Sequence, residues 1–206
     1  MKNFSKSGVF FIIMGLCFLL AAIGLVIYNV NLSAGAAAAN AQLTKALDAQ
    51  LAARSASSAD DPMLKRLNGS SDNIPTKKIN GYELVGSITI PVINIDLAVI
   101  SQWSYPNLEV GPCRYDGTPT NKLVILAHNF DTQFGRLKSL AVGDTVVFTS
   151  VTGEKYTYKV IRKETWSADQ FKQILSGDDW DLTLFTCTYS GSSRVVIRCA
   201  LADETS

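Results

Sequence analysis

Hydrophobic and polar positions divide the chain into three parts. Residues 9–30 are almost continuously apolar, and the next fifty residues are rich in Ala, Ser, Asn and Gln. From residue 81 onward, short apolar and β-branched runs are separated in several places by Gly, Asn or Asp. Such runs indicate strands, and about 125 residues suffice for one domain with one core. We therefore expect three regions, at residues 1–30, 31–80 and 81–206.

The first region predicts a transmembrane anchor. The 22 residues Val9–Val30 would form a helix of about 33 Å, enough to cross a hydrocarbon core about 30 Å thick. A cleaved signal peptide is the alternative, because residues 34–39 are small enough to suit a signal peptidase. The apolar run is longer than a usual signal core and favours an anchor that is kept.

Cations near the apolar run predict its orientation. Lys2 and Lys6 precede the run, and the next cation after it is Lys45. Positive charge collects on the cytoplasmic side of a membrane helix. We expect a single-pass protein of the cell membrane with a cytoplasmic N-terminus, an extracellular C-terminal domain and lipid contacts along the helix.

The second region predicts a stalk followed by a linker. Leu43, Leu47 and Leu51 recur every four residues in an Ala-rich segment, which indicates a helix from Ala36 to about Ala53. This narrow apolar stripe could pack on a partner helix or on the domain, and simple spacing is the role we expect. Residues 55–78 are polar, contain two prolines and indicate a loose linker.

The third region predicts an all-β fold. Its apolar runs are short and closely spaced, which is typical of a barrel or sandwich. We expect one helix in it, Ser167 to Leu175, with Ser167 as its N-cap and Ser176-Gly177 at its end. The expected strands are Leu84–Ile95, Leu97–Ile100, Lys122–Ala127, Thr145–Val151, Lys155–Ile161, Leu182–Cys187 and Arg194–Leu201.

One predicted hairpin carries candidate chemistry. If residues 188–193 form its loop, Cys187 on the first strand lies opposite Arg194 on the second. Directly opposed residues have Cβ atoms about 4.5–5.5 Å apart, so the guanidinium could reach a substrate oxygen held at the thiol. A bulge would shift the register and turn Arg194 to the other face. Arg198 shares the face of Arg194 further from the thiol and is the reserve candidate.

A nucleophilic thiol needs a proton partner, and His128 is the only histidine in the chain. Each residue also has an ordinary structural explanation. A histidine at a strand end can be a hydrogen-bonded structural residue, a cysteine in an apolar strand a small buried hydrophobe, and an arginine after a hairpin a solvated charge. The three together predict a catalytic site at His128, Cys187 and Arg194.

The order and spacing of these segments resemble the sortase family, the cysteine transpeptidases of Gram-positive surfaces. The resemblance lies in Thr183-Leu184-Phe185-Thr186-Cys187 with a following arginine and in the histidine at the end of an apolar strand. Segments 86–97, 134–137 and 140–146 also resemble the family. The resemblance covers roughly residues 82–202 and implies a sortase-like β-barrel of about eight strands with short helices.

The resemblance also implies a reaction. Cys187 would attack a carbonyl of an LPxTG-like sorting signal at the C-terminus of a surface protein, His128 would move protons, and Arg194 would hold the substrate or the oxyanion. An amine from a peptidoglycan precursor or a pilin lysine would resolve the acyl-enzyme. A hydrolytic cysteine peptidase with the same site is one alternative. A catalytically silent barrel that only binds surface proteins is another.

Charge and cysteine spacing exclude other classes of protein. Residues 81–206 carry 11 Lys and Arg against 14 Asp and Glu, a net charge of −3 that does not suit nucleic acid. We expect no cofactor and no metal, although the acidic cluster Asp178, Asp179 and Asp181 could bind a cation instead of forming a solvated turn. Cys187 and Cys199 are not expected to bridge within the hairpin, whereas a Cys113–Cys199 disulfide stays open.

Overall fold

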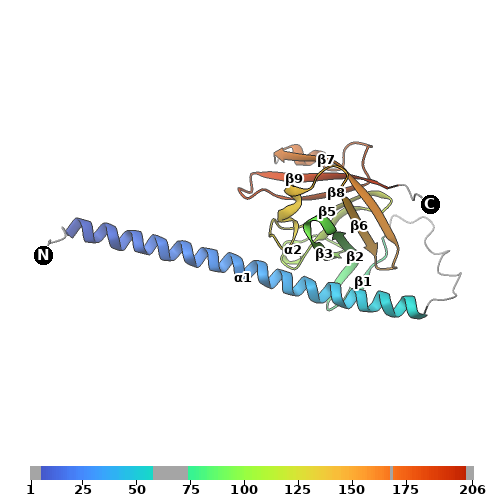
Figure 1. Cartoon of the computed structure of the whole chain (residues 1–206), viewed down its shortest axis with the longest axis horizontal. Coiled ribbons are helices and arrows are strands. Elements are labelled where there is room, and N and C mark those ends of the chain that lie inside the picture. Colours follow the sequence, from blue (N-terminus) through green and yellow to red (C-terminus); the bar gives the residue numbers. More distant parts are fainter. Residues whose placement is uncertain (1–5, 58–73, 168, 203–206) are drawn as a thin grey trace.

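The computed structural model describes residues 6–57, 74–167 and 169–202. Figure 1 shows one long helix, α1 (Lys6–Ser57), whose N-terminal half projects away from a β-barrel and whose C-terminal half runs alongside it. The predicted anchor helix and the predicted stalk helix are therefore one continuous helix. The linker expected at residues 55–78 lies largely outside the described residues.

The barrel is a ring of eight strands. β2, β3, β4, β5, β8, β9, β7 and β6 follow one another around it, and β6 closes the ring by pairing with β2. A short ninth strand, β1 (Lys77–Ile79), extends the sheet beside β2. The ring strands are β2 (Tyr82–Ile90), β3 (Ile95–Ile100), β4 (Cys113–Thr118), β5 (Asn121–Leu126), β6 (Thr145–Ser150), β7 (Lys155–Ser167), β8 (Leu182–Cys187) and β9 (Ser193–Leu201).

The expected barrel of about eight strands is confirmed, but some predicted elements are wrong in extent. The run expected as one strand from Leu84 to Ile95 is broken by a 3₁₀ turn, η2 (Pro91–Ile93). Proline cannot donate to the ladder, and Asn94 turns the chain with a left-handed φ of 53°. The other short helical elements are α2 (Tyr105–Leu108), η3 (Phe134–Ser139) and η4 (Gln170–Gln173).

The helix predicted from Ser167 to Leu175 is wrong. β7 continues to Ser167, and the described residues after it contain η4, one turn of 3₁₀ helix. Ser167 is the last residue of β7, and its backbone N and its hydroxyl both lie within hydrogen-bond distance of Gln170 Oε1, at 2.9 and 3.0 Å. Pairing of β7 with β9 therefore continues to the position that was expected to start the helix.

Buried apolar residues form three clusters, one inside the barrel and two outside it. The largest fills the barrel and includes Ile88, Phe148 and Ile197, all fully buried. A second cluster lies between α1 and the barrel, and a third lies on the outer face, where Ile174 and Trp180 from the β7–β8 loop cover Phe185. The outer cluster places that loop against the strand that carries Cys187.

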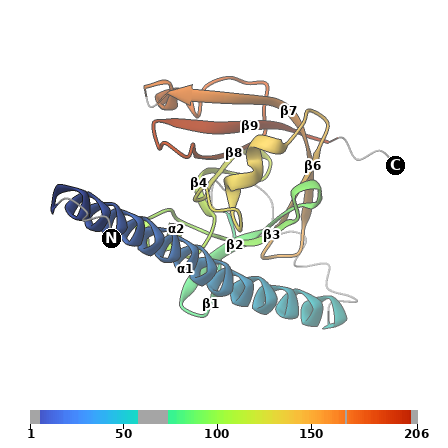
Figure 2. The same ribbon diagram turned by 60° about the vertical axis from the view of Figure 1, so that its left-hand side comes forward.

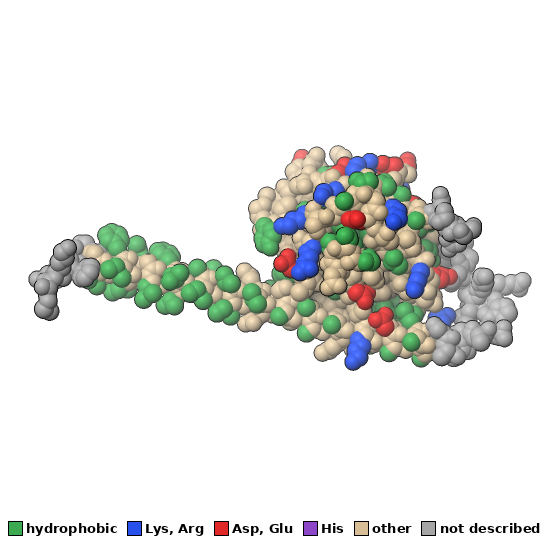
Figure 3. Space-filling view, in the orientation of Figure 1, with side chains coloured by type: hydrophobic (Ala, Val, Ile, Leu, Met, Phe, Trp, Pro, Cys, Tyr) green, Lys and Arg blue, Asp and Glu red, His purple; other side chains and the backbone are tan. Residues whose placement is uncertain are grey.

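The N-terminal half of α1 exposes its apolar side chains in the part of the chain that the structure describes. Its large side chains from Val9 to Val30 are exposed around the helix, and they form the green surface of the projecting arm in Figure 3. By length and composition this half is able to cross a membrane. An apolar helix surface of this extent would be covered by lipid if it spanned a bilayer.

The C-terminal half of α1 packs on the barrel edge, beside β1 and β3 (Figures 1 and 2). Asn40 is fully buried, and its side-chain amide donates to Ala98 O and accepts from Ala98 N, both at 3.0 Å. Thr44 Oγ1 also accepts from Ala98 N, at 2.9 Å. The Asn40 amide thus pairs with β3 as a neighbouring strand would. Its approach requires Gly111, where a Cβ would collide with the Asn40 amide.

The leucine stripe of α1 is buried, so the stalk does more than provide spacing. Leu43 and Leu47 are 2% and 0% exposed and pack against Leu84, Ala98 and Ile100. A stripe with one residue per turn is narrow for a helix in a core. The Asn40 and Thr44 hydrogen bonds add polar contacts on the same face and complete the interface.

Leu47→Ala should lower the free energy of unfolding by about 2–5 kcal/mol, the usual cost of truncating a buried leucine. The measurement is urea unfolding of the full chain in detergent, followed by tryptophan fluorescence. Leu32→Ala, at an exposed position of the same helix, should change the value by less than about 0.5 kcal/mol. Equal values for the two variants would mean that α1 does not stabilise the barrel.

Candidate active site

The register of the β8–β9 hairpin places Cys187 directly opposite Arg194. The expected pairing is confirmed, as is the pairing of Leu182 with Cys199 at the other end of the hairpin. On its other side, Arg194 pairs with Trp166 of β7. Laterally paired residues project to the same face of a sheet. Trp166, Arg194 and Cys187 therefore form one row across three strands.

His128 continues this row on the other side of Cys187. β5 and β8 are parallel and pair Leu126 with Phe185, so the same register two residues later sets His128 beside Cys187. Two hydrogen bonds join the segments that follow β5 and β8 beyond the last pair of the ladder, Leu126 with Phe185. Thr186 Oγ1 donates to Ala127 O at 2.8 Å, and Asn129 Nδ2 donates to Thr188 O at 3.3 Å. His128 and Cys187 lie between these two contacts.

The first of these contacts gives Thr186 a structural position. Thr186 is 3% exposed, and its side chain points away from the face of Cys187 because neighbours along a strand alternate. Its hydroxyl joins the end of β8 to the end of β5. Thr186 therefore holds the two strand ends together from the face opposite the thiol.

The loop after His128 holds the histidine backbone at both ends. His128 N donates to Gln133 Oε1, and Phe134 N donates to His128 O, both at 3.0 Å. Gln133 is fully buried, and Gly135 N donates to Phe130 O at 2.9 Å. A Cβ at Gly135 would overlap the carbonyl oxygens of the loop, so glycine is needed there. The loop closes on itself and holds His128 at the end of β5.

The imidazole is half-buried beside an aromatic ring. The ring centroids of His128 and Phe130 are 4.9 Å apart. Desolvation lowers the pKa of His128 from its usual 6.5, against a smaller opposing effect of the Glu109 carboxylate. Loss of water disfavours the charged form of a buried base. His128 is therefore mainly neutral at neutral pH and able to accept a proton.

Exposure distinguishes the four cysteines, which are all free in the structure. Cys113 and Cys199 are fully buried, and burial is the main cause that raises the pKa of each thiol to about 12. The disulfide that the sequence left open is therefore not formed. Cys17 lies in the apolar half of α1, and Cys187 is partly exposed at the end of β8. Cys187 is the barrel thiol that a substrate can reach.

Arg194 is held by carbonyl groups of its own hairpin. Its Nη1 donates to Gly191 O at 2.9 Å and to Ser193 O at 3.0 Å. Gly191 turns the loop with a φ of 71°, a conformation that favours glycine. A guanidinium has five N–H donors in a planar fork, so two bonds from one nitrogen leave the others able to meet a substrate oxygen.

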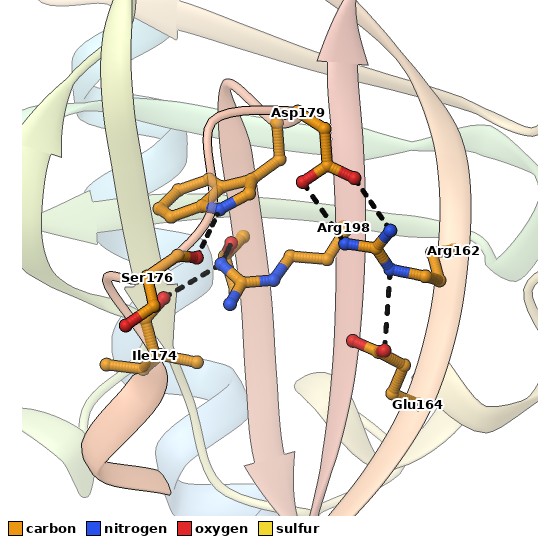
Figure 4. Close-up of polar contacts among 8 residues, drawn as sticks. Arg162, Glu164, Ile174, Ser176, Asp179 and Arg198 are labelled. Carbon is orange, nitrogen blue, oxygen red and sulfur yellow. Dashed lines mark hydrogen bonds and ion pairs between the residues drawn. The ribbon is translucent and has the colours of Figure 1, made fainter. Parts of the chain in front are cut away.

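Arg198 occupies a different environment from Arg194. It is 2% exposed and donates from Nη1 to Thr183 Oγ1 at 2.6 Å and to Ile174 O at 2.8 Å. Its guanidinium carbon lies 4.2 Å from the ring centroid of Trp180 and 5.1 Å from that of Trp166. Figure 4 shows the guanidinium enclosed by the β7–β8 loop. Burial lowers the pKa of Arg198 to about 10, so the group stays charged at neutral pH.

Arg198 thus links the β7–β8 loop to the barrel, because Ile174 belongs to the loop and Thr183 to β8. The loop is closed by a second contact, from Trp180 Nε1 to Ser176 O at 2.9 Å (Figure 4). Arg198, the reserve candidate for the catalytic arginine, therefore supports the loop that covers the outer face of β8.

Arg198→Ala should lower the free energy of unfolding by about 3 kcal/mol, because two acceptors lose a charged donor and two indole rings lose a cation. Urea unfolding of the full chain, followed by tryptophan fluorescence, measures the change. Arg162→Ala is the matched control. Arg162 is partly exposed and pairs with Asp179 at 2.7 Å and with Glu164 at 3.4 Å (Figure 4), so its removal should cost about 1 kcal/mol. A loss as small for Arg198→Ala would contradict its structural role.

The acidic cluster Asp178, Asp179 and Asp181, at the end of the β7–β8 loop, is divided among separate partners. Asp178 pairs with Lys122 and Asp179 with Arg162, both at 2.7 Å. Asp181 Oδ2 accepts from Leu201 N at 2.7 Å. Within the described residues, no group of three or more His, Cys, Asp or Glu side chains is arranged to hold a metal ion. The three carboxylates thus stabilise the loop and the strand ends.

Comparison with known proteins agrees with this fold. The family model described as the sortase domain matches residues 88–202, more than half of the chain. The chain belongs to the sortase family. Sortases are a family of cysteine transpeptidases, and the matched residues include the whole row formed by Trp166, Arg194, Cys187 and His128. No curated protein matches the chain significantly.

Solved sortase structures share the barrel. Sortase C1 of GBS pilus island 1 superposes with a TM-score of 0.53 at 25% identity, covering 59% of this chain and 66% of that one, just under two thirds. Sortase C1 of Streptococcus suis gives a TM-score of 0.54 at 25% identity over 61% of this chain and 76% of that one. Listeria monocytogenes sortase A shares the fold at 22% identity, with a TM-score of 0.53 over 58% and 88%. The sortase subclass is not resolved by these matches.

Sequence patterns did not indicate several residues that shape the site. Gln133 and Asn129 act through hydrogen bonds to the backbone of the strand ends, and Trp166 completes the row beside Arg194. Polar residues in a loop and a tryptophan near the end of a strand carry no pattern of their own. Their roles depend on tertiary contacts that bring β5, β7, β8 and β9 side by side.

Proposed function

We propose that this chain is a membrane-anchored transpeptidase that acts through a Cys187 acyl-enzyme. The observation that carries the proposal is the row of His128, Cys187 and Arg194 on three neighbouring strand ends. Membership of the sortase family supports the reaction class. The proposed substrates are surface proteins with an LPxTG-like C-terminal sorting signal.

In the first step, the Cys187 sulfur attacks the carbonyl carbon of the scissile peptide bond. The C–S bond forms, the C–N bond breaks, and the thiol proton passes through His128 to the leaving amine. Arg194 lies opposite the thiol and donates hydrogen bonds to the oxygen that becomes negative in the tetrahedral intermediate. The products are a thioester on Cys187 and a released C-terminal peptide.

In the second step, an amine attacks the thioester. The new C–N bond forms, the C–S bond breaks, and one proton passes through His128 from the amine to the departing sulfur. The partly buried, mainly neutral imidazole suits the accepting half of this transfer. The proposed acceptor is an amine of a peptidoglycan precursor or of a pilin lysine. Water in place of the amine would make the protein a hydrolytic peptidase.

Trapping of the acyl-enzyme tests the proposal. The full chain in detergent is incubated with a panel of LPxTG-type peptides, and intact-mass and peptide mass spectrometry locate any adduct. We expect a mass increase on Cys187 that equals the peptide up to its threonine less one water, and transfer of this acyl group to form an amide when glycinamide is added. Absence of an adduct with every peptide, in a folded protein, would favour a silent binding barrel. Release by water alone would favour hydrolysis.

We further propose that Val9–Val30 remains in the mature protein as a membrane anchor with the barrel outside. The length and exposed apolar surface of this part of α1 support the proposal. Protease added to intact cells that express the chain should remove the barrel and leave a membrane-bound fragment that begins at Met1. N-terminal sequencing of the mature protein distinguishes a retained anchor from a cleaved signal peptide. A mature N-terminus within residues 34–40 would indicate cleavage.

A further inference from the structure

A groove of about 590 Å³ lies between α1 and the loops that hold the candidate catalytic pair. Its first wall is a short part of the helix, from Asn29 to Ala34, which includes the last two residues of the apolar run Val9–Val30. Its second wall comprises residues 129–132, which follow His128, and Tyr189, which lies two residues after Cys187. The anchor helix and the active-site loops therefore form one concave surface.

Two kinds of contact connect this groove to the catalytic row. Ser33 Oγ and Thr132 Oγ1 lie 3.2 Å apart across the two walls. On the inner side, the Phe130 ring is in contact with the His128 ring at 4.9 Å, and Asn129 bonds to the backbone after Cys187. The groove thus borders the loop that follows His128 and, through Tyr189, the loop that follows Cys187.

The lining of the groove suits a cationic amine. Its polar groups are the amides of Asn29 and Asn129, the hydroxyls of Ser33 and Thr132, and the carboxylate of Asp131. Asp131 is exposed and is the one charged side chain among the lining residues. Carboxylates and amide oxygens accept hydrogen bonds from an ammonium group, and a single negative charge attracts a cation.

We propose that this groove is the entry site of the amine acceptor, with Asp131 as a specificity-determining residue and residues 29–34 of the anchor as a wall. The proposal rests on the transpeptidation proposed above. The acyl donor has already reacted when the acceptor arrives, so the acceptor must approach the thioester from a side where His128 can handle its proton. The groove meets this requirement through Phe130, which lines it and whose ring packs on that of His128.

The reaction balances as follows. The acceptor arrives as an ammonium, is held by Asp131, and loses one proton to solvent through the open side of the groove. Its nitrogen then forms the C–N bond to the thioester carbonyl carbon as the C–S bond to Cys187 breaks. The second proton passes through His128 to the sulfur, which regenerates the thiol. No further reactant is required.

The first test blocks the groove from the anchor side. Ala34→Trp places a large side chain on the helical wall, and Gly35→Trp is the control, because a Cβ at Gly35 meets nothing within 4 Å. Acyl-enzyme formation and its capture by glycinamide are measured separately on the full chain in detergent. Ala34→Trp should lower kcat/KM for glycinamide by about tenfold or more and leave acyl-enzyme formation within about twofold of wild type. Gly35→Trp should change neither step.

The second test removes the charge. Asp131→Asn keeps the side-chain shape and should raise KM for glycinamide by about two- to fivefold, the size expected for an exposed charge pair. Capture by hydroxylamine, which is uncharged at neutral pH, should be unaffected. Added salt should raise KM for glycinamide in the wild type and have little effect in Asp131→Asn, because salt screens exposed charges.

Each outcome separates this proposal from the function on which it rests. If the wild type forms no acyl-enzyme, the proposed transpeptidase is wrong. If acyl-enzyme forms but Ala34→Trp slows that first step, the groove binds the acyl donor and the acceptor proposal is overturned. It is equally overturned if neither variant changes capture by glycinamide. A loss of glycinamide capture without a change in acylation supports it.

Discussion

Replacing Cys187 by alanine should abolish both acyl-enzyme formation and transfer to an amine, while the barrel stays folded. The substitution removes the nucleophile and little volume at a position that is already partly exposed. Peptide transfer is followed by mass spectrometry, and urea unfolding verifies that the free energy of unfolding stays near the wild-type value. Transfer that persists in this variant would exclude Cys187 as the nucleophile.

The two buried cysteines provide the matched controls. Cys113→Ala and Cys199→Ala remove the same atoms from positions that are fully buried. Their thiols have pKa values raised to about 12 by burial, so they contribute almost no thiolate at neutral pH. Both variants should keep the reaction and lose about 1 kcal/mol or more of stability, as expected for a truncated core side chain.

Arg194→Ala should reduce kcat by about 10²–10³, the usual cost of removing one oxyanion donor. Arg194→Lys should recover little of this loss, because an ammonium lacks the planar fork of a guanidinium. Steady-state kinetics with the peptide found by trapping gives both values. The structure supports this assignment by pairing Arg194 with Cys187 in the hairpin.

Arg198→Ala is the comparison for this experiment. Because Arg198 is buried among loop and strand groups, its removal should act on stability first and on kcat by less than about tenfold in protein that is still folded. A larger catalytic loss from Arg198→Ala than from Arg194→Ala, at equal folded fractions, would transfer the catalytic role to Arg198.

The site was predictable where it depended on strand alternation. The pairing of Cys187 with Arg194 follows from a six-residue loop and a two-residue period, and the structure confirms it. The burial of Arg198 was not predictable in the same way. Arg194 and Arg198 lie on the same face of the same strand, so alternation does not distinguish them. Only the tertiary fold brings Ile174 O and the rings of Trp166 and Trp180 to Arg198.

The fold was less predictable where strands are irregular. β4 was not expected, because Cys113–Thr118 includes charged residues and Gly117, whose φ is 74°. Its pairing with β5 shifts register twice, so no simple alternation marks it. Likewise, the break at Pro91–Ile93 falls in an apolar stretch, with no polar residue between Thr89 and Asn94. In both places local backbone geometry outweighed the hydrophobic pattern.

The continuity of α1 has a consequence for how substrates are found. With Val9–Val30 in a bilayer, Ser33 and Ala34 lie only about 6 Å further along the helix axis, at a rise of 1.5 Å per residue. Asn40 and Leu47 attach the barrel to this same rigid rod, with no hinge between the bilayer and the thiol. If this segment spans a bilayer as proposed, the thiol is held at a set height above the lipid headgroups. The proposed reaction would then be a two-dimensional search among membrane-bound partners, limited by lateral diffusion and by how far each partner reaches out of the membrane.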